Sequence, residues 1–164
     1  MTVKGCGKIV FEYPSDFMGT LTVQDTATVS VNVGCGFTRS GNATVNSGAT
    51  LEMAQSGSVT FGKNLTLADG AILGFNFTDK TPPVLDMSGK TLTLNGQSNV
   101  VVKITAAEGK HAKGGANVLT AGGKFAGANV TLAEGAPEWV MGVSVVDGEI
   151  VLASKARGLI LFVK

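Results

Sequence analysis

Charge, aromatic residues, cysteine and long apolar runs are all scarce in this 164-residue chain. Asp, Glu, Lys and Arg make up 15% of it, against roughly a quarter in an average globular protein. The formal net charge is +1 and the basic residues are scattered, so the clustered cations that bind a nucleic-acid backbone are missing. No apolar run approaches the roughly 18 residues of a membrane-spanning helix. These scarcities argue against a nucleic-acid partner and against membrane insertion.

Residue types that carry catalysis are sparse as well. His111 is the only histidine, and there is no motif for a nucleophile elbow, a phosphate-binding loop or a His-Glu-x-x-His zinc helix. Two cysteines and one histidine do not supply four zinc ligands at finger-like spacing. The carboxylates weighed as a catalytic pair are Glu52, Asp69, Asp79 and Asp86. Asp69 sits in an Asp-Gly turn and Glu52 alternates outward between Leu51 and Met53, so we expect no catalytic pair, and the sequence predicts no enzyme activity, no cofactor and no metal site.

Glycine, at 23 positions, and β-branched residues that alternate with hydroxyl and amide residues are abundant. Residues that alternate along a strand point to opposite faces, so this pattern predicts short strands with one buried face. The alternating segments are 21–23, 29–33, 43–45, 50–53, 59–61, 65–67, 75–77 and 92–94. Turn sequences rich in Gly, Asn and Asp separate them at intervals of about six to ten residues.

Two all-β architectures accommodate such strands: a β-sandwich, and a β-solenoid in which successive turns of chain stack on one another. No stretch shows the 3.6-residue apolar period of a helix. The segment Asn64–Ala71 (NLTLADGA) is echoed by Asn129–Ala136 (NVTLAEGA), and Gly115–Val118 by Gly127–Val130 (both GANV). Internal repetition is typical of a solenoid and unnecessary in a sandwich. We therefore expect β-solenoid coils over residues 1–104, with a β-sandwich as the alternative.

Both cysteines lie between glycines, as Gly5-Cys6-Gly7 and Gly34-Cys35-Gly36. Stacked turns of chain would bring such matching contexts side by side. A Cys6–Cys35 disulfide would then add about 3 kcal/mol of stability in the chain-entropy model. The alternative is two small apolar residues packed in the core.

Asn-x-Thr sequons occur at Asn42, Asn64, Asn76 and Asn129. A chain so rich in Asn and Thr forms such triplets readily through its composition. We expect stacked Asn side chains in turns, hydrogen-bonded from one turn of chain to the next, to stabilise the fold.

The last part of the chain, residues 105–164, is expected to form an irregular loop and capping strands continuous with the same domain. Residues 105–127 predict a projecting loop, with His111 at a solvated tip, and Trp139 is the expected plug of the cap. The final strand-like segment is apolar on both faces and consists of Leu159, Ile160, Leu161, Phe162 and Val163. It either completes the core or adds to the open sheet edge of a neighbouring copy.

The opening of the chain reads Gly5–Phe11 (GCGKIVF), Phe17–Val23 (FMGTLTV) and later Ser47–Leu51 (SGATL). Over roughly the first half of the chain, this succession resembles the autotransporter-associated β-strand repeat of bacterial proteins. The resemblance implies a passenger-type, right-handed, single-stranded β-helix in a large surface or secreted protein. The remainder resembles the C-terminal region that follows such repeats, and Thr26 departs from the pattern, which has Gly there.

These observations favour a structural or adhesive extracellular β-solenoid module of a bacterial surface or secreted protein, self-assembling through its C-terminal strand. Its partners would be other copies of itself or neighbouring repeats of the same protein. The alternative is a carbohydrate-binding module that takes glycans along one face or in the 105–127 loop, and a polysaccharide-active β-helix enzyme comes third. The resemblance implies an extracellular or cell-surface location, although the first residues lack the pattern of a secretory signal.

Overall fold

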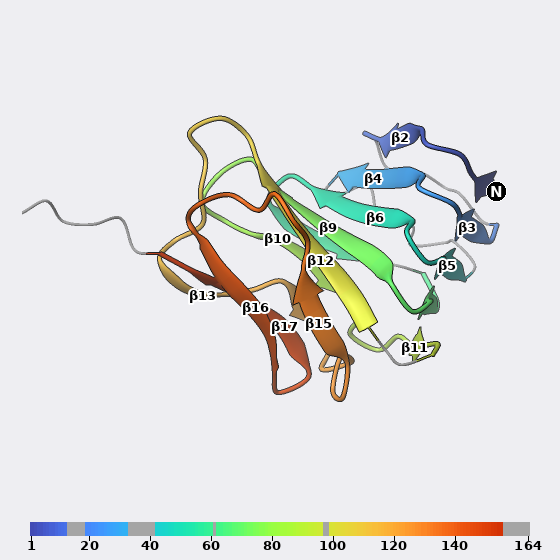
Figure 1. Ribbon diagram of the computed structural model, residues 1–164. Helices are drawn as coiled ribbons and strands as arrows, with labels where there is room; N and C mark the ends of the chain where they lie inside the picture. The colour runs from blue at the N-terminus through green and yellow to red at the C-terminus, as the bar shows by residue number, and fades with distance from the viewer. Residues whose placement is uncertain (13–18, 33–41, 61, 97–98, 156–164) are drawn as a thin grey trace, which may run out of the picture.

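The computed structural model describes residues 1–12, 19–32, 42–60, 62–96 and 99–155. These residues form strands and turns and contain no helix, so the all-β prediction is confirmed. Seventeen strands are distributed over three parallel sheets and one antiparallel sheet (Figure 1).

The strands are named here by sheet, in their spatial order. Sheet A contains β1 (Thr2–Val3), β3 (Leu21–Val23), β5 (Ala43–Val45), β8 (Leu65–Leu67) and β11 (Leu92–Leu94). Sheet B contains β2 (Lys8–Phe11), β4 (Thr28–Asn32), β6 (Thr50–Ala54), β9 (Ala71–Phe77), β12 (Asn99–Ala106) and β15 (Asn129–Leu132). The short sheet contains β7 (Gly57–Thr60), β10 (Pro83–Asp86) and β14 (Thr120–Ala121). The antiparallel sheet contains β13 (Gly115–Val118), β17 (Glu149–Ser154) and β16 (Val140–Val146).

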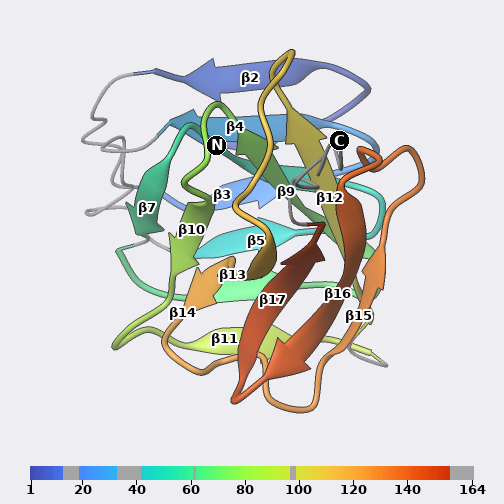
Figure 2. The same ribbon diagram turned by 90° about the vertical axis from the view of Figure 1, so that its left-hand side faces the viewer.

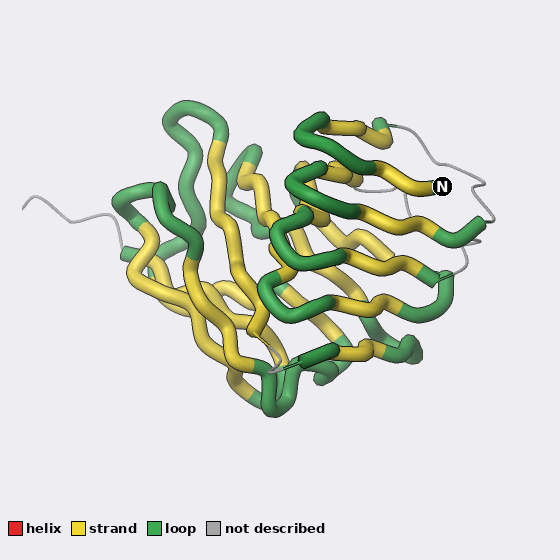
Figure 3. Tube along the Cα trace, turned by 45° about the vertical axis from the view of Figure 1, so that its right-hand side comes forward, coloured by secondary structure: helices red, strands yellow, loops and turns green. Residues whose placement is uncertain are grey.

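The chain alternates between the two sheets, so that a strand of sheet A is followed by a strand of sheet B (Figure 3). We call each such pair of strands a unit: β1 and β2 form unit 1, β3 and β4 unit 2, β5 and β6 unit 3, and β8 and β9 unit 4. In sheet A the row of register partners is Thr2, Thr22, Thr44, Thr66 and Thr93. The first two steps, from Thr2 to Thr22 and from Thr22 to Thr44, cover 20 and 22 residues. In-register threonines present β-branched side chains that pack on their neighbours and uncharged hydroxyls on one face.

The core lies between the sheets and is built from rows of apolar register partners. One such row on sheet B contains Ile9, Val29, Leu51, Leu73 and Val102, and a row on sheet A contains Val3, Val23, Val45, Leu67 and Leu94. Most members of these rows are completely buried. The alternation read from the sequence is therefore the division between the core face and the outer face.

A polar row marks the corner between sheets A and B. Asp69 Oδ1 accepts hydrogen bonds from Asn99 N at 3.1 Å and from Asn99 Nδ2 at 2.9 Å. Asn129 Nδ2 in turn donates to Asn99 Oδ1 at 2.6 Å. At the other end of the stack, Gly5 N donates to Asp25 Oδ2 at 2.9 Å. Asn99 and Asn129 thus form the expected hydrogen bond between successive turns of chain, but they begin strands β12 and β15 and do not lie in turns.

Glu52 is a nearly buried carboxylate on the outer face of sheet B. The residue is 8% exposed, and Oε1 accepts hydrogen bonds from Lys8 Nζ and Ser30 Oγ, each at 2.7 Å. Because β4 lies between β2 and β6, the Lys8 side chain crosses β4 to reach Glu52. Gly74, the register partner of Glu52 on β9, leaves room for it, since a Cβ there would lie 3.1 Å from Glu52 Cβ and Cγ. The ion pair therefore ties unit 1 to unit 3.

Replacing Lys8 with Met is expected to lower the free energy of unfolding by about 1 kcal/mol, because Glu52 loses its cation and, among the described residues, keeps the bond from Ser30. The Lys8 side chain is 48% exposed, so solvent screening keeps the loss below that of a fully buried pair. Urea unfolding measures the change, with the exposed Lys4→Met as the matched control. Equal losses in the two variants would show that the ion pair contributes nothing.

The last part of the chain forms the antiparallel sheet, in which β17 pairs with both β13 and β16. Figure 2 shows β16 and β17 side by side, with β15 next to β16. Asp147 and Gly148 form the tight turn between β16 and β17 with φ of 50° and 78°, as a two-residue hairpin loop requires. Ile150 and Leu152 of β17 are completely buried and join the core.

The internal echoes in the sequence do not occupy equivalent places. Asn64–Ala71 contains β8 of sheet A, whereas Asn129–Ala136 contains β15 of sheet B. Gly115–Val118 is antiparallel β13, whereas Gly127–Val130 enters parallel β15. The echoes were therefore the wrong basis for expecting stacked units. The repetition that the structure does contain is the regular register step of units 1 to 4.

Candidate functional site

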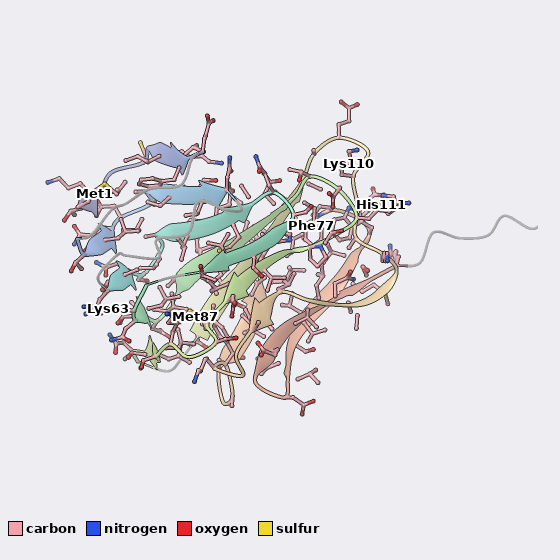
Figure 4. The ribbon with its side chains drawn as sticks, turned by 180° about the vertical axis from the view of Figure 1, so that it is seen from behind. Met1, Lys63, Phe77, Met87, Lys110 and His111 are labelled. Atoms are coloured by element: carbon pink, nitrogen blue, oxygen red, sulfur yellow. The ribbon has the colours of Figure 1, made fainter. Side chains whose placement is uncertain are left out.

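A cleft of about 420 Å³ opens where β9 leads into β10 and where β12 leads towards β13. Its lining residues are Asp79, Lys80 and Thr81 from the first connection and Gly109, Lys110 and His111 from the second. Figure 4 shows Lys110 and His111 together on the loop after β12, at the end of the molecule away from Met1. Two loops far apart in sequence therefore make one site.

The wall after β9 is held in shape by its own backbone. Asp79 Oδ1 accepts a hydrogen bond from Thr81 N at 2.6 Å, which forms an Asx turn. Pro82 and Pro83 follow, and their rings fix φ where the chain enters β10. The Asp79 carboxylate is thus presented to the cleft from a defined turn.

The wall after β12 is anchored at both of its ends. Ala107 N donates to Phe77 O at 2.9 Å, and Lys110 N donates to Ala107 O at 2.9 Å, which closes a tight turn. At the far end, Lys113 O accepts a hydrogen bond from the buried Asn117 side chain at 2.9 Å. Lys110 and His111 therefore project from a short loop with two fixed ends.

Nearby groups hold the pKa of the Asp79 carboxyl below its ordinary value of 3.8. The largest cause is the Ser56 hydroxyl, followed by the backbone N–H of Thr81, and the positive charge of Lys110 adds to the lowering. Ser56 Oγ is buried and makes no hydrogen bond of regular geometry within the described residues. The 2.6 Å bond from Thr81 N is therefore the firmer of the two interactions.

The stabilisation that Asp79 gives to its turn is expected to vanish at acid pH. Because the folded pKa is below 3.8, the unfolded chain takes up the proton first, so the contribution is present above that value and is lost as pH falls through the lowered pKa. NMR titration of the Asp79 carboxyl carbon measures the folded pKa directly. A midpoint at or above 3.8 would contradict this expectation. The variant Asp79→Asn, which does not titrate, is the control for the acid dependence of unfolding.

The four carboxylates weighed as a catalytic pair lie in separate places. Glu52 is on the outer face of sheet B, Asp69 is in the turn before β9 and Asp86 ends β10, and each accepts a hydrogen bond there. Asp79 is the one member of the four that lines the cleft, together with His111. Within the described part of the chain, no group of three or more His, Cys, Asp and Glu residues could hold a metal ion.

Trp139, the expected plug of the cap, packs edge-on against the buried ring of Phe77. The ring centroids are 5.3 Å apart and the ring planes meet at 73°. Phe77 O also accepts the hydrogen bond from Ala107 that begins the cleft loop. Trp139 therefore supports the strand end from which the cleft is built, and its role as a plug stays a prediction.

Two other sequence predictions concern residues outside the described part. Cys6 is exposed and its thiol is free, while Cys35 lies outside the described residues. The Cys6–Cys35 disulfide therefore stays a prediction, and a free-thiol assay on unreduced protein would refute it by counting two thiols. The assembly segment Leu159–Val163 also lies outside the described residues and stays a prediction.

The sequence pointed to part of the cleft. It singled out Asp79 and His111 separately, and the structure brings them together. It did not single out Lys80 or Thr81. The available signal was the run Asp79-Lys-Thr-Pro-Pro83, because Asp followed two residues later by a backbone donor, and then by proline, is typical of an Asx turn.

The cleft brings together one carboxylate, two ammonium groups and an imidazole from exposed or half-buried residues. No described helix is long and apolar enough to cross a membrane. Comparison of the chain with protein-family models, with curated proteins and with solved structures gives no match. The stacked strands and the cleft are therefore the two features from which a function can be inferred.

Proposed function

We propose that this chain is a structural or adhesive module built as a right-handed, single-stranded β-solenoid, located outside the cell or on its surface. The observation that carries the proposal is the parallel, in-register pairing of sheets A and B through units 1 to 4. A sandwich is made of antiparallel sheets, so this pairing favours the solenoid. In a solenoid each unit contacts its neighbours through a continuous hydrogen-bond ladder, which gives a stiff rod.

The outer surface is consistent with such a module. Sheet A presents its row of five threonines, and the corner presents Asp and Asn side chains that hydrogen-bond between successive turns of chain. Hydroxyl and amide groups hydrate the surface without charge. The resemblance of the first half of the chain to the autotransporter-associated β-strand repeat supports the extracellular location.

The proposed partners are other copies of this chain or neighbouring repeats of the same protein, joined through the apolar segment 159–163. An apolar strand segment adds to an open sheet edge by main-chain hydrogen bonds, with alternate side chains in pockets. The experiment compares the full chain with a chain that lacks residues 159–164, by light scattering and electron microscopy at micromolar concentration. Met141→Ser, which removes an exposed apolar side chain elsewhere, is the control.

We expect high oligomers or filaments from the full chain and from Met141→Ser, and a monomer from the truncated chain. A strictly monomeric full chain would overturn the assembly part of the proposal. Association that survives the truncation would place the contact elsewhere on the surface.

A second proposal, favoured by the cleft, is that the module binds a glycan there. The cleft offers the Asp79 carboxylate as an acceptor for sugar hydroxyls and the Lys80 and Lys110 ammonium groups as donors. The two lysines exceed the one carboxylate, so a sugar that carries an acidic group fits best. Hydrolysis of a glycoside typically needs two carboxyl groups, and one lines the cleft, so we propose binding without cleavage.

A glycan array that includes uronic-acid polysaccharides tests this second proposal. Lys110→Ala is expected to abolish binding of acidic glycans, whereas Lys63→Ala, which changes an exposed lysine outside the cleft, should leave binding unchanged. An array without acidic hits, or equal losses in both variants, would rule out the cleft as a glycan site.

A further inference from the structure

The first unit of the stack exposes residues that are buried in every later unit. Ile9 lies in the core row of sheet B and is 40% exposed, whereas its register partners Val29, Leu51 and Leu73 are all 0% exposed. Figures 1 and 3 show β1 and β2 at one end of sheets A and B, with no described strand beyond them. Among the described residues, the core is therefore uncovered at Ile9.

Backbone hydrogen bonds that join each later unit to the one before it have no counterpart in unit 1 within the described residues. Two backbone N–H groups in each of units 2, 3 and 4 donate to the preceding unit at 2.9 Å. One belongs to the residue after the sheet A strand, and the other lies at the start of the sheet B strand. These N–H···O bonds run from Gln24 to Val3, from Asn46 to Val23, from Ala68 to Val45, from Thr28 to Gly7, from Thr50 to Ala27 and from Ile72 to Ala49. By register, the corresponding donors of unit 1 are Lys4 and Lys8. The N–H groups of Lys4 and Lys8 therefore face away from unit 2. The described chain supplies no strand on that side of β1 and β2.

The lysine of β2 does not protect the edge of that strand against pairing. Natural edge strands are commonly guarded by lysine side chains that project over the edge. The one lysine of β2, Lys8, is instead directed back across β4 to Glu52 at 2.7 Å. Val10, on the outer face, is 44% exposed. At the other end of the chain, the core is joined by the buried Ile150 and Leu152 of the antiparallel sheet.

We propose that the end formed by β1 and β2 is a docking surface for one further parallel β-strand unit. The unit that fits has two short strands with apolar residues that alternate towards the core, as Leu21, Val23, Val29 and Val31 do in unit 2. We choose a parallel unit as the partner because the same parallel interface already joins unit 1 to unit 2, unit 2 to unit 3 and unit 3 to unit 4. This inference rests on the proposed β-solenoid and identifies the surface through which it is extended.

The test repeats residues 20–42 directly ahead of Met1. This places a copy of Thr22 opposite Thr2 with the same 22-residue step that joins Thr22 to Thr44. We expect the midpoint of thermal unfolding to rise by at least about 4 °C. We also expect the Lys4 and Lys8 amides to exchange with solvent at least about tenfold more slowly. In the matched control, Val29 and Val31 of the repeated unit are replaced by Lys, which removes its apolar face.

An extended chain with unchanged unfolding and unchanged Lys4 and Lys8 exchange would overturn the proposal, and so would equal effects in the matched control. A dimer of the unextended chain that Ile9→Lys abolishes and Met141→Lys does not would also overturn it, in favour of a second copy docked edge to edge. Both readouts are made in dilute solution and within one chain, so they are independent of assembly and glycan binding. Fast exchange of the Thr28 and Thr50 amides in the unextended chain would instead show that the proposed solenoid itself has failed.

Discussion

Replacing Phe77 with Ala is expected to lower the free energy of unfolding by about 3–5 kcal/mol. Phe77 ends β9, a central strand of sheet B, and its side chain is completely buried. Truncation to Ala removes its apolar contacts, leaves a cavity in a close-packed core and takes away the edge-on contact with Trp139. Equilibrium unfolding in urea measures the loss.

The same variant has a specific optical signature, because Trp139 is the only tryptophan. Without the Phe77 ring beside it, the Trp139 indole becomes more exposed, so its native-state fluorescence is expected to shift to longer wavelength. Phe75→Ala is the matched control, since Phe75 lies on the same strand and is equally buried. It should lose comparable stability without the spectral shift. A shift in both variants, or in neither, would contradict the packing of Trp139 on Phe77.

The variant Gly122→Ala is expected to lower the free energy of unfolding by at least about 3 kcal/mol, because it combines a backbone clash with an unfavourable φ. Gly122 follows β14 with φ of 108°, and a Cβ there would lie 2.7 Å from both Met87 C and Ser88 N. These are main-chain atoms next to β10, which pairs with β14 and bonds to it through Met87 N and Ala121 O at 2.7 Å. The clash is relieved only if the two strands separate.

Gly127→Ala separates the two causes. Gly127 has φ of 79°, and a Cβ built there meets nothing within 4 Å. Its substitution by Ala therefore carries the conformational penalty alone, about 1 kcal/mol. Thermal and urea unfolding of both variants give the difference. Equal losses would show that the close approach of Gly122 to Met87 and Ser88 is not a stabilising feature.

The position of many strands could be predicted from local sequence. The alternating segments 21–23, 43–45, 65–67 and 92–94 coincide with the bounds of β3, β5, β8 and β11. Alternation is a direct consequence of strand geometry, in which successive side chains point to opposite faces. It needs no knowledge of the neighbouring strand, so it can be read from a few residues.

The partner of each strand could not be predicted in the same way. The near-identical segments Asn64–Ala71 and Asn129–Ala136 enter different sheets, and one copy of the GANV sequence is antiparallel β13. A strand forms main-chain hydrogen bonds with whichever strand lies beside it. Its partner and direction are therefore set by the course of the whole chain.

The candidate site shows the same division. The sequence by itself determined that His111 lies in a loop and singled out Asp79 as a candidate carboxylate, and the Asx turn that holds Asp79 was found in the structure. Only the tertiary structure decided that these loops face one cleft, because hydrogen bonds between Ala107 and Phe77 and between Asn117 and Lys113 hold the second loop in place.

Glu52 shows which properties of a side chain depend on its own strand and which depend on other strands. Alternation alone determined that Glu52 faces outward from sheet B, between the buried Leu51 and Met53. The burial of Glu52 was decided by the tertiary structure. The stacking of units brings the Lys8 side chain across β4 to Glu52 and places Gly74 beside Glu52. A side chain's face is fixed by the geometry of its own strand, but its partners are supplied by strands that arrive from other parts of the chain. The composition shows only that charge is scarce, whereas the tertiary structure pairs Lys8 with the nearly buried Glu52 and so joins the first unit to the third.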